Sequence, residues 1–186
     1  MKSGTIIFTG KTKKGSDITL RYPKPSDLSR LLIYINTLSE EHTFITFQGE
    51  KITLADERKY LSSLLKKVRE NRAVVLYALR GEELIGVCDI CLQDKIEHHI
   101  GTFGITVAQE YRNEGVGSLL MRYVFQEAER QLSGLKIVCL GAFDGNEVAI
   151  KMYKKFGFTE YGRLPEGIFY KESYIDHRYM YKRMHG

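Results

Sequence analysis

Hydrophobic and polar positions along the chain follow patterns that predict strands at the N-terminus and helices directly after them. Two short extended runs, residues 5–9 and 17–22, flank a stretch rich in glycine and lysine and predict a β-hairpin. From Leu28 onward, leucines and isoleucines recur at spacings of three and four residues, which is typical of one buried helix face. A second helix is expected from about Thr53, because Asp56 three residues later forms a pattern close to a capping box.

After these helices, further apolar runs predict a sheet with additional helices. Strands are expected at residues 73–80, 84–92, 100–107, 136–140, 158–163 and 173–183, and helices at residues 117–132 and 146–156. The first three of these strands follow each other closely and predict an antiparallel meander, and residues 164–167 would join the last two. The pattern describes an α+β fold with a central mixed sheet of about seven strands and about four helices. We expect a single domain over residues 1–186, with the hairpin of residues 1–22 included.

The distribution of charge is uneven only near the N-terminus. The net charge is +5, and six of the 28 basic residues lie within residues 1–25 against one acid, Asp17. The rest of the chain is balanced, whereas a nucleic-acid footprint normally runs as a stripe along an element. The basic stretch around residues 11–15 is therefore interpreted as a solvated turn, and a nucleic-acid partner is not expected.

No part of the sequence predicts attachment to a membrane. No stretch approaches the roughly 18 consecutive apolar residues of a membrane span. The apolar run of residues 5–8 is too short for a signal peptide. A cytoplasmic protein is expected.

Three cysteines invite a redox or zinc interpretation, which their setting does not favour. Cys88 and Cys91 have CxxC spacing, but residues three apart on a strand point to opposite faces. No second cysteine pair or histidine pair completes a zinc site. Cys139 also lies in an apolar run. All three are expected to be small core residues, and no metal is expected.

The segment from Val107 to Ser118 carries the strongest chemical signal. A strand ends there, glycines follow at positions 115 and 117, and an amphipathic helix begins. This geometry directs backbone N–H groups and a helix N-terminus at one point, which is typical of an anion site. An ordinary glycine turn is the competing interpretation. A dinucleotide fingerprint is excluded because Leu120 replaces its third glycine, and a P-loop is excluded because no lysine follows Gly117.

A second segment, residues 146–158, predicts a short capped helix. Asn146 is a good N-cap, and Gly157 stands where a C-terminal cap belongs. Tyr153 falls on the apolar face together with Ala149, so a core tyrosine is the structural interpretation. This helix follows the glycine loop by about thirty residues, and that pairing favours a functional role over a purely structural one.

Together the two segments resemble the GNAT superfamily of acyl-CoA-dependent N-acyltransferases. Arg112-x-x-Gly115-x-Gly117 matches its pyrophosphate motif, and Asn146-x-x-Ala149-x-x-x-Tyr153-x-x-x-Gly157-Phe158 matches its second motif. The order of elements agrees from about residue 17 to residue 184. The resemblance implies α/β/α layers around a mostly antiparallel sheet that splays in its middle.

The resemblance also implies a cosubstrate, acetyl-CoA or another short acyl-CoA. Its pyrophosphate would be held by Arg112 and by backbone amides of the glycine loop, namely those of Asn113, Glu114, Gly115, Val116, Gly117 and Ser118. The pantetheine arm would bind to the backbone around Ile105 and Val107 and to Asn146. The Tyr153 hydroxyl would face the thioester sulfur.

The implied reaction is direct attack of a primary amine on the thioester. The amine must be neutral, so a base must take its proton. Tyr153 is the candidate acid for the thiolate, and the N–H of Val107 is a candidate donor to the oxyanion. The expected strand at residues 100–107 has no carboxylate or histidine, so we select Glu97 as the base, acting through water and tuned by burial. The alternatives are His98, Asp89, Glu41 and His42.

The acceptor would be a small molecule, a protein N-terminus or a lysine. Residues 40–51 and 165–175 would set its specificity, because both stretches combine aromatic residues with acids. An acyl-CoA-binding regulatory module without turnover is the alternative function. The sequence leaves open the acceptor, the acyl length, the base and the oligomeric state, a homodimer included.

Overall fold

The computed structural model describes residues 2–184. The described chain falls into two compact units. The first runs to Cys91 and continues over Gly104–Ser133, and the second comprises Leu92–Phe103 and the residues from Gly134 onward. Strand β5 (Ile100–Val107) therefore contributes residues to both units. This division describes packing, and the expectation of one domain over residues 1–186 stays a prediction.

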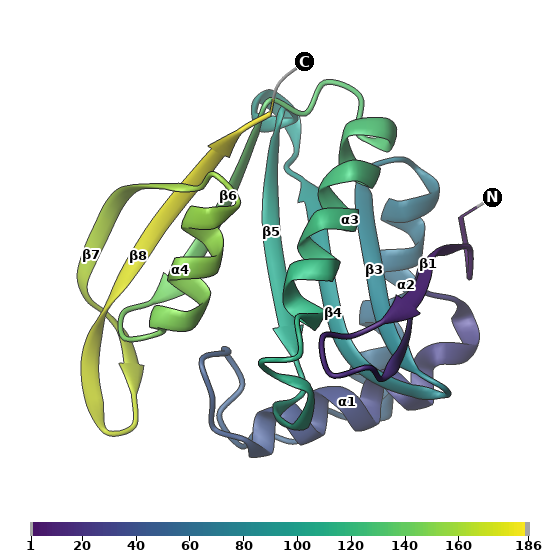
Figure 1. Ribbon diagram of the computed structural model, residues 1–186. Helices are drawn as coiled ribbons and strands as arrows, with labels where there is room; N and C mark the ends of the chain where they lie inside the picture. The colour runs from purple at the N-terminus through teal and green to yellow at the C-terminus, as the bar shows by residue number, and fades with distance from the viewer. Residues whose placement is uncertain (1, 185–186) are drawn as a thin grey trace. The chain divides into compact units, whose positions relative to one another are not determined.

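The first unit combines a sheet with helices on both of its faces. Its strands are β1 (Ile6–Lys11), β2 (Asp17–Arg21), β3 (Ala73–Arg80), β4 (Glu83–Leu92) and the C-terminal half of β5. Its helices are α1 (Leu28–Glu40), α2 (Leu54–Arg69) and α3 (Val116–Gln131), and the short 3-10 turns are η1 (Pro25–Asp27) and η3 (Gln109–Tyr111). Figure 1 shows α3 on one face of this sheet and α2 on the other.

Strand β3 forms the centre of the first unit's core. Residues 73–79 are each at most 5% exposed. A strand that is covered on both faces by helices can be apolar throughout, which explains why this run shows no alternation. β3 pairs antiparallel with β2 on one side and β4 on the other, and β1 pairs with β2. These pairings confirm the expected N-terminal hairpin and the β3–β4 hairpin of the meander.

The second unit is built around a long C-terminal hairpin. It contains the N-terminal half of β5, the 3-10 turn η2 (Lys95–Glu97), β6 (Ile137–Phe143), α4 (Glu147–Lys155), β7 (Thr159–Tyr170) and β8 (Ser173–Arg183). β6 pairs in parallel with β5 over Ile100–Thr102 and antiparallel with β8, which in turn pairs with β7. In Figure 1, α4 lies against one face of these strands.

The expected fold class is confirmed with one more strand. Among the described residues the hydrogen-bonded order is β1-β2-β3-β4-β5-β6-β8-β7. The sheet is mixed and mostly antiparallel, and it has eight strands rather than about seven because β1 joins it through β2. The expected splay in the middle of the sheet stays a prediction.

One predicted connection is wrong. Residues 164–167 do not join two strands but lie inside β7, where its register with β8 shifts between Leu164 and Ile168. The turn occurs instead at Lys171 and Glu172, whose φ angles are 48° and 62°. Two consecutive left-handed residues are what a tight hairpin turn of the primed type requires. Proline and glycine at positions 165 and 167 mark an irregularity within a strand, which a sequence pattern does not distinguish from its end.

The cysteines are free thiols with different surroundings. Cys88 is fully buried, as expected, whereas Cys91 and Cys139 are only partly buried. Within residues 2–184, no group of histidine, cysteine and acidic side chains is arranged to hold a metal ion. The helices of the same range are all too short or too polar to cross a bilayer.

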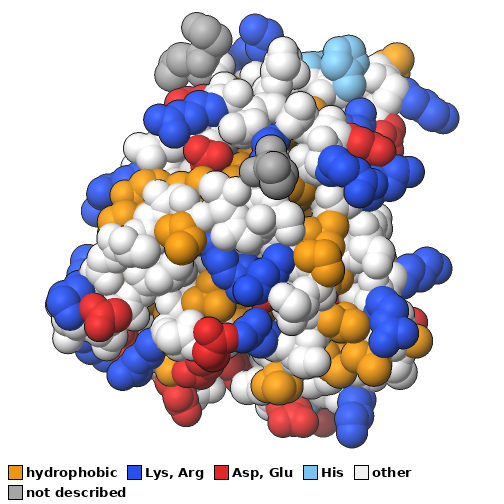
Figure 2. Space-filling model, turned by 90° about the vertical axis from the view of Figure 1, so that its right-hand side faces the viewer, with side chains coloured by type: hydrophobic (Ala, Val, Ile, Leu, Met, Phe, Trp, Pro, Cys, Tyr) orange, Lys and Arg blue, Asp and Glu red, His pale blue; other side chains and the backbone are white. Residues whose placement is uncertain are grey.

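Basic side chains do not form a stripe on the face shown in Figure 2. There Lys and Arg side chains are interspersed with Asp, Glu and apolar side chains. The local excess of lysine near the N-terminus lies at the β1–β2 turn, where Lys11, Lys13 and Lys14 are exposed, as a solvated turn requires. Thr12 in the same turn is buried, at 6% exposure, so part of this turn packs against the protein.

Candidate functional site

The turn between β5 and α3 has the geometry of an anion site. After η3, Asn113 and Gly115 both take left-handed backbone conformations, with φ angles of 64° and 86°. Such a turn directs neighbouring N–H groups to one concave side. Gly115 is the N-cap of α3, and no side chain caps this helix. The first N–H groups of α3 are therefore available to a ligand with negative charge.

The side chain of Arg112 stabilises this turn through a hydrogen bond and an ion pair. Its Nε donates a hydrogen bond to the carbonyl oxygen of Val107 at 2.9 Å, and its guanidinium forms an ion pair with Glu41 at the end of α1. Glu41 also accepts a hydrogen bond from the backbone N–H of Gln109 at 3.1 Å. Arg112 was expected to bind pyrophosphate, but its side chain is engaged with protein groups. Glu41, an alternative base in the sequence analysis, is committed to the same contacts.

Glu114 connects the turn to the N-terminal hairpin. Its side chain is buried, accepts a hydrogen bond from the Thr12 hydroxyl at 3.1 Å and forms an ion pair with Lys14 at 3.4 Å. Its carbonyl oxygen accepts a hydrogen bond from the backbone N–H of Lys13 at 2.9 Å. The side chain of Lys13 lies 3.1 Å from the position that a Cβ atom on Gly115 would take. The hairpin therefore packs directly on the candidate anion site.

The predicted helix of the second motif is confirmed together with its caps. The Asn146 side-chain oxygen accepts a hydrogen bond from the N–H of Ala149 at 3.3 Å. Gly157 ends the helix with a φ angle of 88°. Tyr153 is buried, and its ring makes edge-on contacts with Phe103 and Phe158 at centroid distances of 6.0 and 5.9 Å. The core role of the ring is clear, and the catalytic role of the hydroxyl stays a prediction.

Glu97 lacks the burial on which its expected role depended. It ends the 3-10 turn η2 and is exposed, as is His98 beside it. The Nδ1 of His98 lies 2.8 Å from the carbonyl oxygen of Lys95, so its ring is engaged within the turn. An exposed carboxylate keeps its water shell, so the burial that the expected role required is absent at this position.

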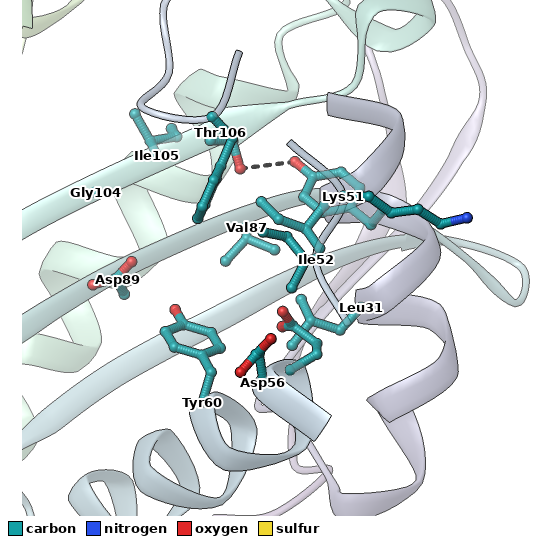
Figure 3. Close-up of a pocket in the computed structure, with 14 residues that line it drawn as sticks. Leu31, Lys51, Ile52, Asp56, Tyr60, Val87, Asp89, Gly104, Ile105 and Thr106 are labelled. Atoms are coloured by element: carbon teal, nitrogen blue, oxygen red, sulfur yellow. Dashed lines mark hydrogen bonds between the residues drawn. The ribbon is translucent and has the colours of Figure 1, made fainter. Parts of the chain in front are cut away.

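The first unit contains a cavity of about 520 Å³ beside β5. It lies between α1, α2, β4 and β5, and its lining is mostly apolar (Figure 3). Ile105 and Thr106 of β5 line it, and the Thr106 hydroxyl accepts a hydrogen bond from Tyr34 at 2.9 Å. This volume is in the range of small-molecule sites. The cavity and the glycine turn are joined by the last residues of one strand.

Asp89 is the group in this cavity best suited to proton transfer. It projects from β4, and its Oδ1 lies 3.0 Å from the position of a Cβ atom on Gly104, so the glycine leaves room for it. Burial raises the pKa of Asp89 to about 6, although a hydrogen bond from the Cys91 thiol at 3.5 Å acts in the opposite direction. In Figure 3 the Tyr60 hydroxyl also points into the cavity on the side of Asp89. Sequence reasoning named Asp89 only as an alternative, because burial at one point of a strand is not visible in its pattern.

A turn with the geometry of an anion site and a carboxyl with a raised pKa thus lie along one strand, an arrangement suited to group transfer from an anionic donor. Residues 35–158 match the family model described as the Acetyltransferase (GNAT) family. The chain belongs to this family, which confirms the resemblance of its two motifs.

Known proteins are similar to this chain in sequence or in fold. L-amino acid N-acetyltransferase AaaT of Escherichia coli (strain K12) is 33% identical over 99 residues, which cover 53% of this chain and 60% of the relative. A GNAT-family acetyltransferase from Streptococcus pneumoniae has a TM-score of 0.82 at 26% identity, covering 90% of this chain and 99% of that chain. The yncA protein of Salmonella typhimurium, solved with its cofactor acetyl-CoA, has a TM-score of 0.77 at 15% identity, covering 90% and 94%. The match to AaaT spans less than two thirds of that relative's length.

The contact between hairpin and turn predicts a specific effect on CoA binding. Thr12→Val keeps the shape of the side chain but removes the hydroxyl that donates to Glu114. Loss of a donor to a buried carboxylate lowers the stability of the folded protein by about 1 to 3 kcal/mol. The turn is expected to become less ordered as a result. Calorimetric titration with CoA should show affinity lowered by roughly three- to tenfold. Thr9→Val, on the exposed part of β1, is the control. Lowered stability with unchanged CoA affinity would show that the hairpin supports the fold but not the site.

Proposed function

We propose that this protein transfers an acetyl group from acetyl-CoA to a primary amine and that the cavity of the first unit receives the amine. The observation that carries the proposal is Asp89, a carboxyl with a raised pKa in an apolar cavity beside β5. The same strand ends, three residues after Gly104, at the turn that has the geometry of an anion site. Donor and acceptor sites thus share one rigid element.

The donor half of the proposal uses the backbone of the turn. The residues from Asn113 to Ser118 would bind the pyrophosphate through N–H groups, and the N-terminus of α3 adds its positive end. These groups fit a phosphate because Gly115 presents no side chain and the helix has no capping side chain. The thioester of acetyl-CoA supplies an acyl carbon that is open to attack by amines. Ile105, Val107 and Asn146 remain the proposed contacts of the pantetheine arm.

The acceptor half of the proposal assigns Asp89 the role first expected for Glu97. An amine enters largely as an ammonium ion, which has no lone pair, so Asp89 takes its proton directly or through water. The amine nitrogen then forms a bond to the acyl carbon, and the carbon–sulfur bond breaks. The N–H of Val107 donates to the acyl oxygen, where negative charge develops. Tyr153 donates a proton to the departing sulfur, and the acylated nitrogen releases its second proton, which restores the Tyr153 hydroxyl through water.

Replacement of Asp89 should remove the base without disturbing the shape of the cavity. Asp89→Asn is expected to lower kcat/KM by roughly 10²- to 10³-fold. The wild-type enzyme should gain activity as the pH rises through about 6, because Asp89 must lose its proton to act, and the variant should lack this step. Initial rates of CoA release across pH 5 to 9 with an amine panel provide the measurement.

Glu97→Gln is the matched control for the choice of base. Because Glu97 is exposed, this variant should keep close to wild-type kcat/KM. A large loss of kcat/KM in Glu97→Gln, with no loss in Asp89→Asn, would show that Glu97 is the base. CoA binding without release of free thiol for any amine would support the acyl-CoA-binding module instead.

Asp89 should also reduce the stability of the protein at neutral pH. A carboxyl whose pKa is raised on folding favours its protonated form, so the folded state is penalised as the pH rises from about 4 to about 6. At pH 8 the full penalty is present, and Asp89→Asn is expected to increase the free energy of unfolding by about 2 kcal/mol. Urea denaturation at pH 8 checks this, and below pH 4 the gain should disappear. A variant that is less stable than wild type at pH 8 would mean that Asp89 is satisfied in the folded protein.

Tyr153→Phe separates the role of the ring from that of the hydroxyl. The ring contacts with Phe103 and Phe158 do not need the hydroxyl, so the variant should fold and bind acetyl-CoA. If the hydroxyl protonates sulfur, kcat should fall by roughly 10²-fold with little change in KM. The loss should shrink for acyl donors with a more acidic thiol. A wild-type kcat in Tyr153→Phe would assign Tyr153 to the core alone.

A further inference from the structure

The cavity beside β5 contains a second carboxyl, which is buried and which the proposed reaction does not use. Glu57 lies in the first turn of α2, is 4% exposed and lines the cavity. None of the described residues donates a hydrogen bond to its side chain or forms an ion pair with it. Burial alone raises the pKa of Glu57 above its ordinary value. A largely buried side chain with a carboxyl that has no protein partner is rare in proteins, because its desolvation is not offset.

The position of Glu57 in its helix does not explain its burial. Acidic residues favour the first turn of a helix, where the helix dipole is positive. Asp56 is in the same turn, is exposed, and accepts a hydrogen bond from the Thr53 hydroxyl at 2.6 Å. Asp56 thus gains the favourable interaction without losing its water. Glu57 has no protein partner, yet its carboxylate oxygens are not among the fully enclosed polar atoms of the described residues and so stay open to the cavity. This points to a ligand in the cavity as the group that completes it.

The charges around the cavity select the kind of ligand. Three of its lining residues are acids, namely Asp56, Glu57 and Asp89. The one lining residue with a positive charge is Lys51, and Figure 3 shows its ammonium group directed away from the cavity. A ligand with a carboxylate would meet only like charges there, whereas a cation would meet opposite ones. The apolar side chains of Leu31 and Ile52 line the same space and suit an alkyl chain.

We propose that the acceptor is a small diamine, with one amine at Asp89 for acetylation and the second, still charged, bound by Glu57. This proposal rests on the proposed function, since it names the substrate class of the same site. The second ammonium supplies the partner that the Glu57 carboxyl lacks, and charge-assisted hydrogen bonds of this kind are the strong ones. The methylene chain between the two amines packs on the apolar lining.

Three acceptors of similar length and different distal group test the proposal. Cadaverine ends in a second amine, pentylamine ends in a methyl group, and aminocaproate ends in a carboxylate. For the wild-type enzyme, kcat/KM should be at least about tenfold higher for cadaverine than for pentylamine and lowest for aminocaproate. In Glu57→Gln the ratio of cadaverine to pentylamine should fall toward one. Glu70→Gln, an exposed carboxyl just after the other end of α2, should keep the wild-type ratio.

Equal kcat/KM for cadaverine and pentylamine in the wild type would overturn the proposal, and so would an unchanged ratio in Glu57→Gln. Calorimetry with cadaverine alone separates this result from failure of the proposed function. If no amine releases CoA, the transferase proposal fails, yet cadaverine binding that weakens about tenfold in Glu57→Gln would still support a site for a diamine. Absence of any cadaverine binding in that case would overturn the site as well.

Discussion

Two carboxylates, Glu41 and Glu114, hold the turn between β5 and α3 in its left-handed form, and the candidate donor site depends on them. Asn113 and Gly115 both have positive φ angles, and a non-glycine residue in this region is strained by about 1 kcal/mol or more. Glu41 offsets this cost through Arg112 and the backbone of Gln109. Glu114 offsets it through the N-terminal hairpin. A backbone anion site has no side chains of its own to order it, so neighbouring elements must do so.

The cavity differs from the turn, because the cost of burying its acids Asp89 and Glu57 is not fully offset by protein partners. Burial raises the pKa of both Asp89 and Glu57, and neither forms an ion pair among the described residues. Such groups reduce the stability of the folded chain at neutral pH. A ligand that brings positive charge or a transferable proton recovers this free energy on binding. The stable core around β3 tolerates the cost because it is apolar and covered on both faces.

Local patterns were sufficient for the fold class and for the two motifs. The apolar runs predicted most strands of the sheet, and the caps at Asn146 and Gly157 are where the sequence placed them. The glycine turn and the helix after it follow from residues that are close in the chain. Family membership was reached on the same basis, since a motif is a local arrangement of residues with a fixed spacing. Lys11, Lys13 and Lys14 at the β1–β2 turn are exposed, as the sequence indicated for this part of the basic excess.

Tertiary structure decided the contacts on which the chemistry depends. Thr12 and Glu114 are 102 positions apart, so no local pattern relates them. Glu97 and Asp89 are both acids near strands, and only the packing of helices over β4 shows that Asp89 is half-buried in a cavity while Glu97 is exposed. The bulge within β7 likewise depends on its register with β8. Sequence alone determined which elements form and which family they define, because these depend on neighbours along the chain. Burial, ion pairing and the tuning of acids depend on neighbours in space, and only the folded chain supplies those.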